Sequence, residues 1–402
     1  MLQITSPING AILNHNHGIE TEKSLKIKVT GISQAGTPVM VNGVMATMDG
    51  LNFSADVELT QKVNKIRASA YSVNGMYTQE VTVLWDKNSY KRYSFFIDDH
   101  SFLFTDLAKE RPARAFDHFY LAGLKKIHEE SGLKVTLNCF FHNDHFDCDM
   151  TQVPDCWKSE FVDNSDWMKL SFHSLGEFPD RLYIEASEEE FAHDYDLVHD
   201  QIVRFAGEET FIAPAVIHWG NISPGAAKAF IDRGGRVYNG MFRARYMGGP
   251  SLADRAAGTK TNNIAKSQDG CGAPTREGAA SMFGFGFDEH FNRIDEVSFA
   301  ANHRAYYDPN LGVVFTRGCC CCNLVPIEKI PGRYAQAFAE AEISGNEFFA
   351  GGSHEQYTFP YYHNYIPDHM QRIECAAKCL YEGGCTPVFY SEGFMGNMSW
   401  GK

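Results

Sequence analysis

Residues 93–100 have the sequence Tyr93-Ser94-Phe95-Phe96-Ile97-Asp98-Asp99-His100, an apolar strand that ends in two adjacent carboxylates. A buried strand that stops here exposes both acids at its carboxyl edge, where the chemistry of α/β barrels and α/β sheets takes place. Strand side chains alternate in direction, so one acid can bind a metal ion while its neighbour transfers a proton. Asp also caps turns and helices, and the pair alone favours that simpler interpretation.

The surrounding residues 89–402 alternate strand-like and helix-like segments, which predicts a parallel sheet or an irregular β/α barrel. The expected strands are 93–97, 134–141, 168–172, 214–218, 236–240, 312–316, 346–351 and 386–390. Amphipathic spacing predicts helices over 115–131 and 188–206, and Ser187-Glu188-Glu189-Glu190 is a capping-box start for the second. The Gly-rich, polar stretch 241–300 is typical of a long insertion, and such loops often bind ligands.

Residues 1–88 are β-like throughout and predict a separate small sandwich. Short alternating runs, such as 25–29 and 53–57, are separated by the turn sequences Asn42-Gly43, Asp49-Gly50 and Asn74-Gly75. Basic and acidic residues balance within this segment, so the whole net charge of −14 falls on residues 89–402. The difference in charge supports a domain boundary near residue 88, with 1–88 and 89–402 as the two domains of a multidomain protein.

Length and charge exclude several classes of protein. A chain of 402 residues is long enough for two domains, and a net charge of −14 without a basic stripe argues against nucleic acid as a partner. No apolar run approaches the ~20 residues of a membrane span. Residues 1–7 have no signal-peptide pattern, so we expect a cytoplasmic protein; an extracellular location stays open if a leader was removed. The oligomeric state stays open.

The 11 cysteines all lie after residue 138, and Cys319–Cys322 are contiguous. Contiguous cysteines on a strand point to alternate faces and cannot all pair with one another, so we do not expect a disulfide framework. The flanking apolar residues favour a buried strand lined by thiols over a metal site. Cys375 and Cys379 are four residues apart on an expected helix and could chelate a metal, but core packing is the simpler interpretation.

Further strand ends place histidines and acids at the same expected edge. His173 and Glu177 follow strand 168–172, and the two side chains could bind one cation together if the segment turns helically. His218 lies at the end of strand 214–218, and His354 follows strand 346–351. An Asp/His/Glu ligand set suits a divalent metal ion, zinc first, with iron, manganese, nickel or cobalt as alternatives.

A rival cluster follows strand 134–141. His142, Asp144 and His145 lie within four residues of each other and could form a second binding feature or only a polar loop. The cluster has no carboxylate pair at a strand end, so the set that begins with Asp98 and Asp99 is the stronger candidate site.

Residues 89–402 resemble the polysaccharide deacetylase (NodB-homology) superfamily. Phe96-Ile97-Asp98-Asp99 is similar to the first motif of that family, and Phe172-His173-Ser174-Leu175-Gly176-Glu177 is similar to the second, with Glu177 in place of its last His. Residues 213–220 lie where the third motif would fall, and His354 lies where a late His would fall. Residues 1–88 resemble the Ig-like modules appended to carbohydrate-active enzymes.

This resemblance implies a metal-dependent hydrolase that acts on an acylated carbohydrate. It implies Asp98 as the catalytic base and His354 as the general acid, with the metal ligands Asp99, His173 and Glu177. His218, Trp219 and His100 would contact the substrate, with Trp219 as a platform for a sugar ring. His100 replaces the usual Gly, and the third motif lacks its Arg. The alternatives are a non-catalytic carbohydrate-binding protein on the same barrel and a hydrolase of another C–N or C–O bond.

Overall fold

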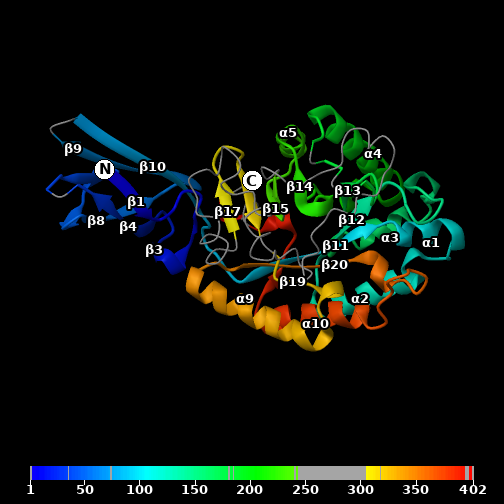
Figure 1. The fold of residues 1–402 in the computed structure, drawn as a ribbon. Helices are drawn as coiled ribbons and strands as arrows, with labels where there is room; N and C mark the ends of the chain where they lie inside the picture. The colour runs from blue at the N-terminus through cyan, green and yellow to red at the C-terminus, as the bar shows by residue number, and fades with distance from the viewer. Residues whose placement is uncertain are drawn as a thin grey trace.

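The protein has an all-β part at one end and a mixed α/β part that forms the rest of the molecule (Figure 1). The computed structural model describes residues 2–34, 36–72, 75–179, 182–183, 185–239, 241–242, 305–316, 318–393 and 398–400. Most of the expected insertion 241–300 lies outside the described residues. No helix in the described part of the chain is long and apolar enough to cross a membrane.

Two five-stranded sheets make up the all-β part. One has the strands β1 (Leu2–Ser6), β4 (Leu25–Ser33), β8 (Asn52–Leu59) and β7 (Thr47–Asp49) in that order, with β3 (Gly18–Glu20) also paired to β4. The other has the order β2 (Ile12–Leu13), β10 (Gly75–Trp85), β9 (Val63–Ser72), β5 (Val39–Val41) and β6 (Val44–Met45). All pairings are antiparallel except that of β2 with β10.

The alternation of apolar and polar residues determines how these strands pack. In β4, every second residue from Leu25 onward is buried, and the intervening residues face outward. Asn42 and Gly43 connect β5 to β6 with φ values of 46° and 82°, the left-handed conformation that a type I′ hairpin turn requires. The runs 25–29 and 53–57 therefore form strands as their sequence patterns predict.

A parallel sheet forms the centre of the α/β part. Its strand order is β13 (Met168–Ser174), β12 (Val135–Phe140), β11 (Arg92–His100), β20 (Phe348–His354) and β19 (Cys320–Cys321), and β21 (Thr386–Pro387) also pairs with β11. Every pairing in this sheet is parallel. All nine residues of β11 are buried, as expected for a strand covered on both faces. The carboxyl ends of β11, β12, β13 and β20 therefore meet at one edge.

Helices cover the strands from two sides (Figure 1). One group consists of α2 (Phe119–Ser131), α9 (Ile330–Ser344) and α10 (His369–Glu382), and the other contains α3 (Lys158–Asp163), α4 (Glu188–Ala206) and α5 (Pro224–Asp232). The helix α1 (Phe102–Glu110) follows β11 directly. The capping box at Ser187 opens α4 at the predicted residue, and α4 ends at Ala206 as predicted. The sequence patterns predict neither α1 nor α9.

A second, smaller sheet has the order β15 (Val237–Asn239), β18 (Val313–Thr316) and β17 (Ala305–Asp308), and β14 (Asn221–Ile222) pairs with β16 (Met241–Phe242). Side chains from this smaller sheet and from the parallel sheet share one inner core, which includes Phe96, Val237, Val314 and Phe348. The strands thus surround a common interior, but those in the described residues belong to separate sheets, not to one closed barrel.

The expected strand 214–218 is wrong. These residues form no strand ladder, and His218 begins a 3-10 turn, His218–Gly220. Pro214 has no N–H to donate; Asn239 N donates a single hydrogen bond to Ala215 O (2.7 Å). The segment still runs beside the sheet, because Ile212 N donates to Leu170 O (3.0 Å), and it delivers His218 to the carboxyl edge.

Candidate metal centre

The strand β11 is irregular at its carboxyl end. Ile97 pairs with Leu137 and His100 pairs with Cys139, so Asp98 and Asp99 together lie opposite the single residue between those partners. Such a bulge turns side chains away from strict alternation. Asp99 has φ 67°, a left-handed conformation that is uncommon outside Gly and often found at functional sites. Strict alternation would direct the two carboxylates to opposite faces of the sheet. The irregularity removes that alternation at Asp98 and Asp99.

A second irregularity lies in β13. Cys139 pairs with Phe172, but the next residue of β12, Phe140, pairs with Ser174. His173 is therefore the extra residue of this pairing. The two irregularities lie at the same level of the sheet and bring the His173 ring to both acids, with Nδ1 4.0 Å from Asp98 Oδ1 and Nε2 3.2 Å from Asp99 Oδ1.

Asp99, His173 and His218 form a buried cluster of three metal-ligating atoms. Asp99 Oδ1 lies 3.2 Å from His173 Nε2 and 3.3 Å from His218 Nδ1, and the two ring nitrogens are 3.3 Å apart. The three residues are at most 8% exposed. The cluster combines an acid from β11, a histidine from β13 and a histidine from the turn after residue 217.

Main-chain carbonyls fix the orientation of both rings. His173 Nδ1 donates to Val216 O (3.0 Å), and His218 Nε2 donates to Glu177 O (3.1 Å). A ring nitrogen that donates to a carbonyl carries the proton, so the other nitrogen of each neutral ring presents a lone pair. Both lone pairs point to Asp99 Oδ1. This arrangement of carbonyl, imidazole and vacant lone pair is the one that orients histidines around metal ions.

The cluster fits a divalent cation. Asp99 Oδ1 is buried and, among the described residues, has no hydrogen-bond partner other than the two histidine rings that face it, while Asp99 Oδ2 accepts a hydrogen bond from Gln356 Nε2 (2.9 Å). When both rings are neutral, one carboxylate oxygen and two imidazole nitrogens, all acceptors, face one another in this buried site. A cation would satisfy all three, and a set of one carboxylate and two imidazoles suits zinc and related divalent metals.

The environment separates the two neighbouring acids in pKa. Burial by itself would raise the pKa of Asp99, but His354, His173 and His218 outweigh it and hold the pKa well below its ordinary value. Burial and then the charge of Asp99 raise the pKa of Asp98 well above its ordinary value, against the hydrogen bond that Asn138 Nδ2 donates to Asp98 Oδ1 (2.6 Å). Asp99 is therefore the permanent anion, and Asp98 is the group that can hold or release a proton.

The ring environments differ as well. Burial lowers the pKa of His173 below its ordinary value despite the adjacent Asp99 carboxylate. Burial would also lower the pKa of His218, but Asp99 and Glu177 outweigh burial and raise this pKa above its ordinary value. Burial lowers the pKa of His354, against the attraction of Asp99. A neutral His173 and a neutral His354 can each offer a lone pair at neutral pH.

Glu177, expected as a ligand beside His173, has its side chain elsewhere. Its Oε2 lies 2.5 Å from His145 Nε2, and its backbone N–H donates to Asp144 Oδ2 (2.6 Å). The expectation required a helical turn from His173 onward, but β13 continues to Ser174, so the four-residue spacing does not bring the two side chains together. The rival loop, with Asp144 and His145, instead binds the Glu177 segment, and the place expected for Glu177 in the cluster is taken by His218.

The two remaining expected substrate contacts lie in different environments. Trp219 is 40% exposed, has φ 64°, and its ring centre lies 5.6 Å from that of His218. His100 is fully buried, and its Nε2 lies 2.9 Å from Tyr120 Oη. Burial lowers the pKa of His100 to about 3. The structure thus places Trp219 partly at the surface next to His218, and it places His100 in the core with its Nε2 against Tyr120.

His354 lies opposite Asp98 in the pairing of β20 with β11, as the expected position at the carboxyl edge requires. Its Nδ1 lies 3.0 Å from Asn323 Oδ1 and 3.5 Å from Cys321 Sγ. Three supporting amides were not identified from the sequence, namely Asn138, Asn323 and Gln356. Asn138 follows the strand pattern of β12, and Gln356 follows His354 by two residues, so nearness to a predicted strand end was the available signal for both.

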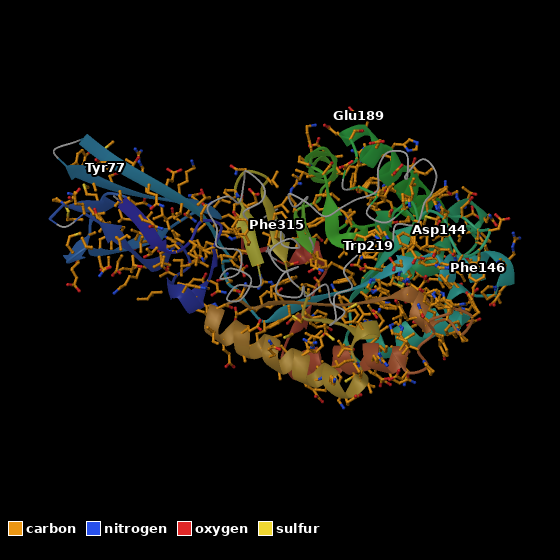
Figure 2. The ribbon with its side chains drawn as sticks, viewed as in Figure 1. Tyr77, Asp144, Phe146, Glu189, Trp219 and Phe315 are labelled. Atoms are coloured by element: carbon orange, nitrogen blue, oxygen red, sulfur yellow. The ribbon has the colours of Figure 1, made fainter. Side chains whose placement is uncertain are left out.

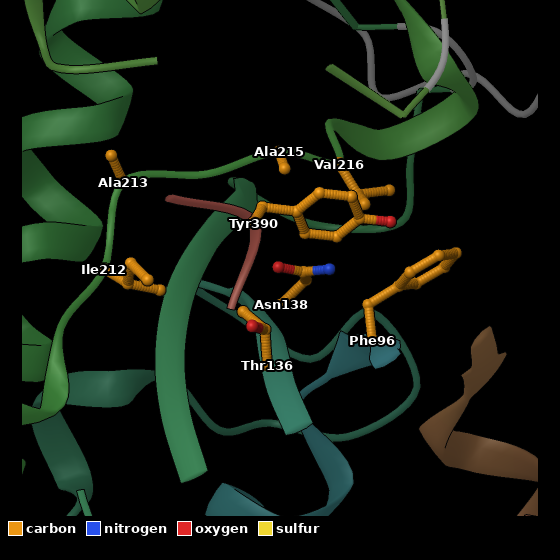
Figure 3. Close-up of a pocket in the computed structure, with 8 residues that line it drawn as sticks. All are labelled: Phe96, Thr136, Asn138, Ile212, Ala213, Ala215, Val216 and Tyr390. Carbon is orange, nitrogen blue, oxygen red and sulfur yellow. The ribbon is translucent and has the colours of Figure 1, made fainter. Parts of the chain in front are cut away.

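A small cavity lies beside Asn138, the residue that donates to Asp98 (Figure 3). Its volume of about 10 Å³ is about the space of one water molecule, and its lining comprises Phe96, Thr136, Asn138, Ile212, Ala213, Ala215, Val216 and Tyr390. The amide of Asn138 projects into it between Thr136 and the Tyr390 ring (Figure 3). The residue that donates to Asp98 therefore also borders this cavity.

No protein-family model matches the chain, and no curated protein matches it. Among solved structures, a peptidoglycan N-acetylglucosamine deacetylase is 10% identical, covering 76% of this chain and 89% of its own, with a TM-score of 0.30. A Bacteroides ovatus xyloglucanase is 9% identical, covering 95% and 99%, with a TM-score of 0.24. A modular endo-β-1,4-mannanase from Cellulomonas fimi is 16% identical, with a TM-score of 0.16. That match covers 21% of this chain and 18% of the mannanase, so the chain spans less than a fifth of the mannanase's length.

Proposed function

We propose that the protein is a metal-dependent hydrolase that removes an acyl group from a carbohydrate. The observation that carries the proposal is the buried cluster of Asp99 Oδ1, His173 Nε2 and His218 Nδ1, in which main-chain carbonyls hold both rings so that these nitrogens face the carboxylate oxygen. The two sequence motifs that resemble polysaccharide deacetylases, at residues 96–99 and 172–177, support the choice of an acylated sugar.

Asp99, His173 and His218 would hold the metal, with zinc as the first candidate and iron, manganese, nickel or cobalt as alternatives. When bound, the metal would supply Lewis-acid chemistry, which polarises an acyl carbonyl and lowers the pKa of a water. Three protein ligands leave room for these two groups. The cluster lies at the carboxyl edge of a parallel sheet, where substrates reach the sites of α/β proteins.

Asp98 would act as the base. Its raised pKa makes it a stronger proton acceptor than an ordinary carboxylate, and Asn138 fixes its position. The oxygen of the attacking water forms a bond to the acyl carbon, and Asp98 takes the proton. His354 takes up a proton from solvent and then gives it to the leaving nitrogen or oxygen as the bond from that atom to the acyl carbon breaks. Asp98 afterwards returns its proton to solvent, and the products are a carboxylic acid and a free amine or alcohol.

Trp219 would form part of the carbohydrate site. It is a large aromatic side chain, labelled in Figure 2, that is partly exposed next to the cluster residue His218, and aromatic rings offer broad apolar surfaces. The net charge of −14 does not favour a polyanionic glycan. Residues 1–88 would form a separate Ig-like module with a spacer or packing role, next to a catalytic domain over residues 89–402.

The metal assignment is tested by measuring the zinc bound per chain after purification and dialysis against zinc. The wild type is expected to retain one zinc, and His218→Ala is expected to lose it. Glu177→Ala is the matched variant, because its side chain lies against His145, and it is expected to keep the metal. Retention by His218→Ala together with loss by Glu177→Ala would instead support the ligand set expected from the sequence.

Catalysis is tested by acetate release from N-acetylated chitooligosaccharides and from acetylated xylan. Asp98→Asn is expected to keep zinc and to lose release by about 100-fold or more, because a positioned base contributes about 10²–10⁴ in rate. Oligosaccharide binding by the zinc-loaded wild type without any acetate release would support the non-catalytic carbohydrate-binding alternative.

A further inference from the structure

The run Cys319–Cys322 leads directly to a residue that contacts the candidate site. Cys320 and Cys321 form β19, which pairs with β20, and the 3-10 turn Cys322–Leu324 then carries Asn323. Asn323 is 5% exposed, and its Oδ1 lies 3.0 Å from His354 Nδ1. The cysteine strand therefore places a buried amide beside the histidine that ends β20.

Several contacts hold the Asn323 side chain and backbone. Cys321 Sγ donates to Asn323 Oδ1 (3.0 Å), and Ser353 Oγ lies 3.4 Å from the same oxygen. Arg372 Nη1 donates to the Asn323 and Val325 carbonyls at 3.5 and 3.2 Å. The donation from the Cys321 thiol to Oδ1 favours the orientation in which Oδ1, and not Nδ2, faces His354.

This orientation determines which nitrogen of His354 is protonated. An amide oxygen only accepts, so the nitrogen that faces it must carry the hydrogen. Nδ1 of His354 is engaged by Asn323 and lies 3.5 Å from Cys321, which leaves Nε2 as the nitrogen available to the site. His354 lies opposite Asp98 in the pairing of β20 with β11, so it ends its strand beside the proposed base.

We propose that Asn323 is a positioning residue that holds His354 as the Nδ1–H tautomer, so that only Nε2 exchanges protons with the substrate. The inference rests on the proposed hydrolase function and deepens it. Nε2 takes up a proton before it can donate one to the leaving group. The bond from Nδ1–H to Asn323 is present in the neutral ring and in the imidazolium, so the ring does not rotate during the transfer.

The tautomer is measured directly by ¹⁵N NMR of the full chain labelled at histidine, with zinc added. His354→Gln identifies the His354 signals by difference among the 16 histidines. We expect the Nδ1–H pattern for His354 in the wild type and a mixture of tautomers in Asn323→Leu. An Nε2–H pattern in the wild type, or an unchanged pattern in Asn323→Leu, overturns the inference whether or not the protein releases acetate.

A kinetic measurement shows whether the contact between Asn323 and His354 contributes to the reaction. With N-acetylated chitooligosaccharides as the probe, Asn323→Leu is expected to lower kcat by about 10-fold or more with little change in KM, as for other groups that orient a functional histidine. Asn323→Asp keeps the acceptor oxygen and is expected to retain the tautomer and to lose less activity. An equal loss in both variants would contradict the positioning role.

Asn346→Leu is the matched control. Asn346 is also 5% exposed but lies before β20, at the end away from His354, and the variant is expected to keep the His354 tautomer and kcat. If the tautomer is Nδ1–H and depends on Asn323 while the wild type releases no acetate, the proposed hydrolase function fails and the positioning contact stands.

Discussion

The all-β part and the carboxyl edge of the parallel sheet follow opposite rules. In β4 and β8 the side chains alternate strictly between core and solvent, and the sequence pattern predicts the packing. At the ends of β11 and β13 the pairing shifts by one residue, and buried polar side chains collect there. In this molecule, a regular alternation of buried and exposed residues therefore indicates a region that contributes to stability. An interrupted strand pairing indicates the candidate site.

The largest effect is expected from a substitution in the core of the all-β part, where the strands alternate regularly. Leu25 in β4 is fully buried, so Leu25→Ala is expected to lower the free energy of unfolding by about 2–5 kcal/mol, because it removes apolar contacts and leaves a cavity. Urea unfolding measures the change. Lys28→Ala, at an exposed position of the same strand, is expected to stay within about 0.5 kcal/mol of wild type, and zinc binding should survive in both variants. A large loss in Lys28→Ala would show that alternation does not govern this sheet.

The second prediction concerns a substitution at the irregular carboxyl end of β11 that changes the charge of a side chain but hardly its shape. Asn tolerates the left-handed φ of Asp99, but Asp99→Asn removes the charge that faces the two histidines. Zinc affinity is expected to fall by about 100-fold, measured by competition with a chromophoric chelator. Asp56→Asn, on the exposed face of β8, is the control and is expected to keep zinc affinity. Unchanged affinity in Asp99→Asn would remove Asp99 from the ligand set.

A third prediction uses His369, a buried histidine beneath the edge. Its ring nitrogens lie 2.6 Å from Ser353 Oγ and from Thr358 Oγ1, and burial, then His354 and Arg372, lower its pKa to about 3. The unfolded chain binds a proton near pH 6.5 that the folded chain takes up only near pH 3. Stability from this group is present above pH 6.5 and is lost as the pH falls toward 3.

At pH 5 the linkage predicts a loss of about 2 kcal/mol in unfolding free energy relative to pH 8. His369→Gln cannot titrate and is expected to remove that part of the pH dependence, although it will be less stable at pH 8 if its amide replaces the two hydrogen bonds imperfectly. Urea titrations at both pH values test the difference. Parallel pH slopes for the variant and the wild type would contradict the prediction.

The smallest effect compares two glycines with open surroundings. Gly43 in the β5–β6 turn has φ +82°, and Gly332 in α9 has no positive φ; a Cβ would meet no atom within 4 Å at either position. Gly43→Ala is expected to lower stability by about 1 kcal/mol because of the left-handed backbone. Gly332→Ala is expected to raise it by up to about 1 kcal/mol. Thermal unfolding of both variants provides the measurement, and equal shifts would contradict the conformational argument.

Part of the site could be predicted from the sequence. Asp99 and His173 were recognised as metal-ligating candidates because each follows an apolar strand, and parallel strands bring their carboxyl ends together. The choice of Glu177 over His218 assumed a helical turn after His173, and that assumption depends on where β13 ends. The one-residue shifts in strand pairing come from contacts between distant segments, so the local pattern does not contain them.

The fold shows the same limit. The helix α4 has a capping box and regular apolar spacing, so its bounds follow from its own residues. Residues 214–217 are also apolar, but Pro214 and the single bond between Asn239 and Ala215 leave them without a strand ladder. Asn323 follows four cysteines whose apolar neighbours predict core packing. Its contact with His354 depends on the pairing of β19 with β20, which the local sequence does not contain.

The histidine orientation has a consequence for protein engineering. The acceptors that orient His173 and His218 are the main-chain oxygens of Val216 and Glu177, and every amino acid supplies a main-chain oxygen. The side chain at position 177 can therefore be randomised in a library without removing the group that orients His218. Substitutions at position 177 would change the surroundings of His145, while the main-chain carbonyls would keep the rings of His173 and His218 in their orientations.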